Sequence, residues 1–151
     1  MRFHWSVLAL ASLSPLCRAS ADDLPARFSV IAVAPATTSI FVGRLTVTPS
    51  LFVREATDYK ARLGIELWPY GFHDEAKVVI VVGNDQLGQL AGGHPVAFTG
   101  HVTRRNGQTR RISGRAVPTG PDSGKLDIRV FLTSQMTISF STTYQVRQPA
   151  P

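Results

Sequence analysis

Residues 95–118 read PVAFTGHVTRRNGQTRRISGRAVP, and apolar and polar side chains alternate on both sides of Asn106-Gly107. Alternation with a period of two is typical of a strand with one buried face. A two-residue Asn-Gly turn would set Phe98 opposite Arg115, whereas a three-residue loop, Arg105-Asn106-Gly107, keeps the apolar residues together. We therefore predict a hairpin with that loop and with Gly107 in a left-handed bulge. Its inner face should contain Val96, Phe98, Gly100, Val102, Ile112, Gly114 and Ala116.

The same alternation recurs along the chain, and no stretch shows a sustained helical period. A second hairpin is predicted from Lys125–Thr133 and Thr137–Val146. Further strands are predicted at 28–33, 39–48, 51–53, 59–68 and 78–82, with loops at 72–75 and 85–93. Since 78–82 is entirely β-branched, we expect a central strand covered on both faces. About eight strands without crossover helices predict an all-β fold, either an antiparallel two-layer sandwich (immunoglobulin-like or jelly-roll-like) or a small barrel.

The first 21 residues have the order of a secretory signal peptide. A basic start at Arg2 precedes a mostly apolar run, and Ala19-Ser20-Ala21 ends it in small residues. The apolar run is about 15 residues, shorter than the roughly 20 of a membrane-spanning helix. We predict a signal peptide at 1–21, one all-β domain at 22–146 and a flexible tail at 147–151. The mature chain would then be exported to the periplasm or the extracellular space, soluble, without a transmembrane segment and free of cysteine, because Cys17 is the only one.

Charge is concentrated in the first hairpin. The formal charge of +6 falls to +4 once Arg2 and Arg18 leave with the signal peptide. Five arginines without an intervening acid fall in this hairpin: Arg104, Arg105, Arg110, Arg111 and Arg115. Because the guanidinium fork suits phosphate, sulfate and carboxylate, these residues are candidate anion ligands. Alternatively, these arginines only keep the tip of the hairpin soluble and its sheet edge unpaired.

Catalytic and metal chemistry find little support in the sequence. His73, His94 and His101 are the histidines after the leader, and their spacing assembles no metal site. We predict no catalytic residues, no metal and no cofactor. The remaining enzymatic hypothesis is a loop pocket at His73 and Asp74, beside a possible ligand rim of Trp68, Tyr70 and Phe72. Aromatic residues at strand ends more commonly cap the core.

The sequence therefore predicts an exported non-catalytic binding or accessory module. Its expected partner is an anionic lipid or acidic glycan, whereas nucleic acid is disfavoured because the outer face of the arginine hairpin offers no aromatic side chain for base stacking. Thr137–Gln145 resembles the last strand of chaperone–usher pilus subunits, and that resemblance implies strand addition to another protein at an open sheet edge. A self-associating surface-assembly subunit is thus the alternative, and the oligomeric state stays open.

Overall fold

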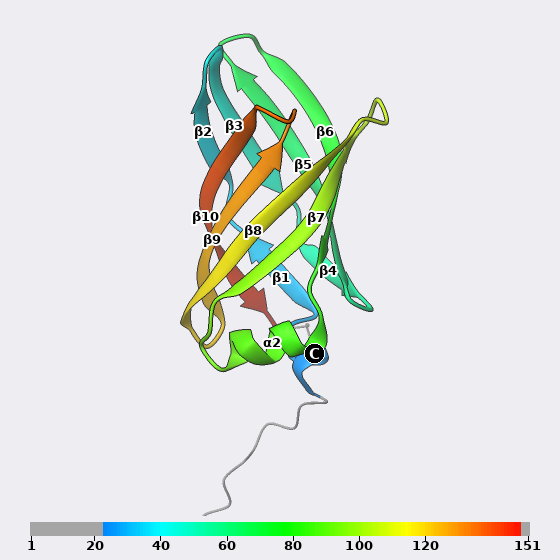
Figure 1. The fold of residues 1–151 in the computed structure, drawn as a ribbon, viewed down its shortest axis with the longest axis vertical. Helices are drawn as coiled ribbons and strands as arrows, with labels where there is room; N and C mark the ends of the chain where they lie inside the picture. The colour runs from blue at the N-terminus through cyan, green and yellow to red at the C-terminus, as the bar shows by residue number, and fades with distance from the viewer. Residues whose placement is uncertain (1–22, 149–151) are drawn as a thin grey trace, which may run out of the picture.

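The computed structural model describes residues 23–148, so the predicted signal peptide lies outside the described residues. Ten strands and two short helices follow one another along this part of the chain (Figure 1). Their bounds are α1 Leu24–Arg27, β1 Val30–Val33, β2 Ala36–Ile40, β3 Gly43–Pro49, β4 Phe52–Glu55, β5 Asp58–Trp68, β6 Phe72–Val81, α2 Asn84–Ala91, β7 Val96–Arg104, β8 Thr109–Gly120, β9 Ser123–Phe131 and β10 Thr137–Arg147.

The strands form a closed antiparallel barrel. Eight of them pair in the order β5-β4-β1-β10-β9-β8-β7-β6, and the pairing of β6 with β5 closes the ring. The β2–β3 hairpin extends the wall because β4 pairs only with the first part of β5, which leaves Leu63–Trp68 free to pair with β3. Of the two predicted architectures, the chain therefore adopts the barrel.

The predicted register of the first hairpin is confirmed, and the predicted second hairpin forms between β9 and β10. Phe98 faces Gly114 across β7 and β8, and the Arg104 N–H bonds to the carbonyl of Gln108 at 2.9 Å, which leaves Arg105-Asn106-Gly107 as the loop. Gly107 has a φ of +84°, the left-handed conformation that the bulge requires. In the second hairpin Ile138 lies opposite Val130 and Phe140 opposite Ile128.

Four local predictions are wrong. Residues 39–48 are not one strand, because β2 and β3 turn back at Phe41-Val42, and 72–75 begins β6 instead of forming a loop. Val81, in the β-branched run, is 43 % exposed, since a barrel wall always presents one face to solvent. Residues 85–93 contain helix α2, whose two buried side chains, Leu87 and Leu90, were too few to reveal a period.

Helix α2 plugs one end of the barrel (Figure 1). Its Leu87 is fully buried, and Leu90, one turn later, joins the core with Phe98 and Tyr144. The Gly83 N–H at the start of the helix donates to Oε1 of Gln86 at 2.8 Å, which satisfies one of the free donors there. The Nε2 group of Gln86 in turn donates to the carbonyl of Ala97, tying the plug to β7.

The opposite end of the barrel is open. Four turns surround it: β2–β3, β5–β6, β7–β8 and β9–β10 (Figure 1). We call this end the mouth. The largest fully buried side chains, Phe28 and Leu87, lie toward α2, so the core is packed best at the closed end.

Candidate functional site

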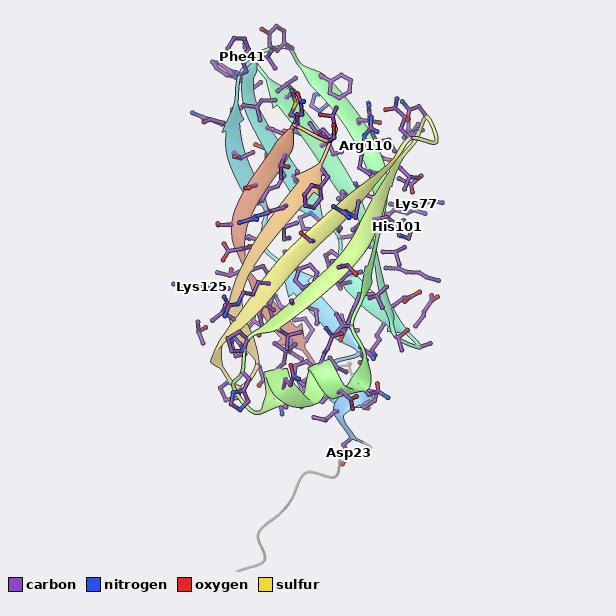
Figure 2. All side chains as sticks on the ribbon, viewed as in Figure 1. Asp23, Phe41, Lys77, His101, Arg110 and Lys125 are labelled. Atoms are coloured by element: carbon purple, nitrogen blue, oxygen red, sulfur yellow. The ribbon has the colours of Figure 1, made fainter. Side chains whose placement is uncertain are left out.

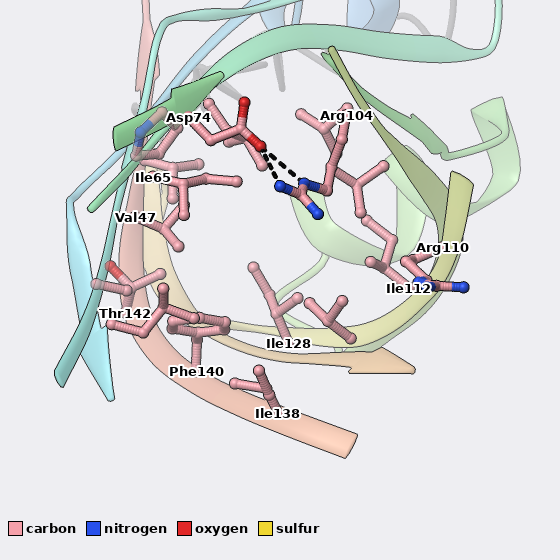
Figure 3. A pocket seen from close by; sticks show the side chains of 18 of the residues that line it. Val47, Ile65, Asp74, Arg104, Arg110, Ile112, Ile128, Ile138, Phe140 and Thr142 are labelled. Carbon is pink, nitrogen blue, oxygen red and sulfur yellow. Dashed lines mark hydrogen bonds and ion pairs between the residues drawn. The ribbon is translucent and has the colours of Figure 1, made fainter. Parts of the chain in front are cut away.

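The mouth half of the barrel encloses an apolar cavity of about 330 Å³. Every second residue along each strand faces inward and forms the cavity wall. Most of these residues are aliphatic. Ile65, Ile128 and Val130 are only half-buried, because their inner faces border space and not other side chains. Figure 3 shows Val47, Ile65, Ile112, Ile128, Ile138 and Phe140 around this space.

A second, smaller cavity of about 70 Å³ continues toward the closed end. Val33, Phe52, Ile80 and Ile128 line both cavities, and Leu90 of α2 borders the smaller one. The lumen therefore contains two neighbouring apolar cavities, one at the mouth and one that borders the helix.

The mouth carries a half-buried ion pair. Asp74 points inward from β6, and both Nε and Nη2 of Arg104 lie 2.7 Å from its Oδ2 (Figure 3). The other carboxylate oxygen accepts the Glu75 N–H at 2.8 Å. The Asp74 side chain is 13 % exposed and that of Arg104 36 %. Chiefly through the hydrogen bond from Arg104, and then through that backbone bond, the pKa of Asp74 is lowered, so the carboxylate stays ionised.

Arg110 is a second cation at the mouth. It lies opposite Val102 across β7 and β8, so its stem shares the inner face and borders the cavity. Among the ion pairs of residues 23–148 none includes Arg110, and in Figure 3 its guanidinium points away from the Asp74–Arg104 pair. Its charge is therefore free for a partner.

The structure divides the five candidate arginines between two surfaces. Because even-numbered residues of β7 and β8 face inward, Arg104 and Arg110 lie at the cavity mouth. Arg105 is outside and pairs with Glu75 at 2.9 Å between two exposed side chains. Arg111 stacks over the Phe131 ring at 4.5 Å, and Arg115 is exposed on the outer wall. They do not form one cluster.

The residues considered for catalysis or metal binding are also separated. His73 and Asp74 occupy opposite faces of β6, with His73 exposed and 3.5 Å from Glu66. Within residues 23–148 no three histidine, cysteine or carboxylate side chains gather as a metal site would require. Trp68 and Tyr70 are 69 % and 66 % exposed, so the expectation that they cap the core is wrong.

The cavity itself was not predicted from the sequence. Its signal was weak: the inward positions of the mouth half, such as Ala36, Val47 and Val130, are small or β-branched, whereas the closed half has Phe98 and Tyr144. Because the sequence predicts a loop at 72–75, it gives Asp74 no inward position. If β6 is extended to residue 72, the alternation of side chains places Asp74 on the inner face, beside Arg104.

Comparison with known proteins adds no functional assignment. No protein-family model matches this chain, and no curated protein is similar to it in sequence. Neither helix in the part of the chain that the structure describes has the length and apolar character needed to cross a membrane.

Proposed function

We propose that this protein is a non-catalytic binding protein that holds a small apolar molecule in its barrel lumen. The observation that supports the proposal is the apolar cavity of about 330 Å³, which lies within the size range of small-molecule sites, roughly 300–1,000 Å³. Side chains that border an apolar cavity lack packing contacts on one side, and a ligand would restore them. Burying roughly 300 Å² of apolar ligand surface would give about 7 kcal/mol before the entropic cost of association.

The polar groups at the mouth define the preferred end of the ligand. Nε and Nη2 of Arg104 contact Asp74, and Nη1 makes only a long 3.4 Å contact with Gln108. The guanidinium therefore keeps N–H donors that a ligand at the cavity entrance can use. Together Asp74, Arg104 and Arg110 carry a net charge of +1. The best ligand is therefore apolar over its length with an anionic or hydrogen-bond-accepting group at the mouth.

Binding is favoured over catalysis by the chemistry of the lining. The titratable residues that line the large cavity are Asp74, Arg104 and Arg110, and the first two neutralise each other. General acid–base catalysis near neutral pH requires a group whose pKa lies close to 7. The pKa of Asp74 is instead lowered below its usual value.

Two fluorescent probes test the proposal: N-phenyl-1-naphthylamine, which is neutral, and 1-anilinonaphthalene-8-sulfonate, which is anionic. Both should become fluorescent on binding, and Arg110→Gln should weaken the anionic probe more than the neutral one. The double variant Val47→Phe/Val130→Phe fills the lumen and should abolish both signals. Its matched control, Val53→Phe/Val81→Phe, adds the same groups to exposed positions and should leave them intact. Equal effects of the two double variants would reject a lumen site.

Export is part of the proposal, on the strength of residues 1–21 as a signal peptide. The intact mass of the protein recovered outside the cytoplasm tests it, with cleavage after Ala21 as the expected result. An unprocessed N-terminus would contradict the assignment.

A second candidate is self-association through strand edges. Strand β2 has β3 as its one hydrogen-bonded neighbour, and the Thr137–Ser141 part of β10 pairs with β9 alone. Such edges can accept another strand. Sedimentation velocity distinguishes the two candidates, because a monomer at high concentration excludes assembly but not lumen binding.

A further inference from the structure

Exposed apolar side chains gather at the mouth. Of the nine large hydrophobic residues that are exposed in the described chain, six lie on or beside the turns around the cavity entrance. We call them the rim: Phe41, Val42, Trp68, Tyr70, Phe72 and Met136. Phe41 projects fully into solvent at the far tip of the β2–β3 turn (Figure 2). Exposed apolar side chains that lie near one another favour an interaction surface.

The rim is held together by backbone contact between two turns. Arg44 pairs with Trp68 across β3 and β5, so the β2–β3 and β5–β6 turns lie side by side. The contact is close: a Cβ on Gly43 would lie 2.1 Å from the Trp68 carbonyl oxygen. The aromatic side chains at 41, 68 and 70 are thus carried on one connected tip and not on independent loops.

Basic residues outnumber acidic ones around the mouth. The four mouth turns, with four residues on either side of each, contain six arginines, Arg44, Arg104, Arg105, Arg110, Arg111 and Arg129, against three acids, Glu66, Asp74 and Glu75. Asp74 and Glu75 are already paired with Arg104 and Arg105. Since the remaining charge is positive, the rim complements an anionic surface.

From this arrangement we infer that the rim docks on a lipid bilayer that contains anionic lipids, with the aromatic tip at headgroup depth and the cavity mouth facing the membrane. Trp and Tyr favour that depth because one end of each side chain is apolar and the other polar. Basic residues near an anionic leaflet add electrostatic attraction. The inference extends the proposed lumen binding, since docking would let an apolar ligand pass between bilayer and lumen without crossing water.

Trp68 provides a direct readout. The chain has two tryptophans, so Trp5→Phe leaves Trp68 as the sole tryptophan, which can be excited selectively over tyrosine, whether or not the leader is removed. The protein is purified as the expressing cell produces it. It is then mixed with phosphatidylcholine vesicles, with or without phosphatidylglycerol. We expect a blue shift of Trp68 emission, quenching by brominated phosphatidylcholine, stronger binding to the anionic vesicles and weakening by added salt.

Two double variants in this background separate the rim from general surface apolarity. Phe41→Ser/Tyr70→Ser should reduce vesicle partitioning by about tenfold or more, because both rings lose their burial in the interface. Leu51→Ser/Val53→Ser removes two exposed apolar side chains away from the mouth and should change vesicle partitioning little. Unchanged Trp68 emission with vesicles, or equal losses in both variants, would overturn the inference.

Further outcomes distinguish the alternatives. A blue shift that grows with protein concentration in the absence of vesicles would overturn membrane docking in favour of a rim that contacts a second copy of the chain. The lumen-filled variant Val47→Phe/Val130→Phe should still bind vesicles while losing the naphthylamine probe. Failure of lumen binding and failure of docking are therefore observed separately.

Discussion

Gly100 is a position where the barrel wall leaves no room for a side chain. It lies on β7 opposite Ile80 of β6, and an added Cβ would be 2.1 Å from the Val79 carbonyl oxygen and 3.0 Å from the Ile80 Cα. Both obstacles are backbone atoms in the barrel wall, so relief requires the two strands to separate. We predict that Gly100→Ala strongly destabilises the fold.

The magnitude follows from the contacts. Overpacking costs about 1–3 kcal/mol, and each strained or lost ladder hydrogen bond adds about 1 kcal/mol. We therefore expect the free energy of unfolding to fall by about 3–4 kcal/mol. For a domain of this size, at about 4 °C per kcal/mol, the melting temperature should fall by roughly 12–16 °C.

Thermal and urea unfolding followed by circular dichroism measure this effect. Gly64→Ala is the matched control: it lies within β5, and its Cβ would meet nothing closer than the Thr48 carbonyl oxygen at 3.7 Å. That substitution should be neutral or stabilise by about 0.5–1 kcal/mol, because alanine has less unfolded-state entropy. If both variants shifted stability alike, the steric argument for β6 and β7 would be refuted.

The remaining predictions concern the mouth, the plug and the outer wall. Because Arg104 lowers the folded-state pKa of Asp74 below its unfolded value, the carboxylate stabilises the fold at neutral pH, and this contribution is lost as pH falls from the unfolded pKa through the folded one. Melting temperatures across acid pH should therefore decline less steeply in Asp74→Asn, and an unchanged slope would contradict the assignment. Leu87→Ala should lower the free energy of unfolding by about 2–5 kcal/mol in urea titrations, since a fully buried side chain is removed. Arg111→Gln should cost at most about 1 kcal/mol, the value of an exposed cation–π contact with Phe131, and a loss above 2 kcal/mol would show a larger role.

Periodicity predicted the hairpins because it is a local property. If Phe98 and Ile112 share a face, the loop must be Arg105-Asn106-Gly107. The same register turns Arg104 and Arg110 inward. The same parity applied to β6 would have placed Asp74 inside. Helix α2 could not be predicted from periodicity, because Gly88 interrupts an eight-residue segment that buries only Leu87 and Leu90.

The amino-acid sequence alone determined the all-β class, the register of the β7–β8 hairpin and which side chains of the two C-terminal hairpins face inward, since alternation along a strand depends only on neighbouring residues. The tertiary structure alone decided that β5 and β6 close a ring, that α2 seals one end and that the other end encloses a cavity with an aromatic rim. These features depend on which strands meet across the barrel and on how far their inward side chains reach into the shared lumen. No single segment contains that information.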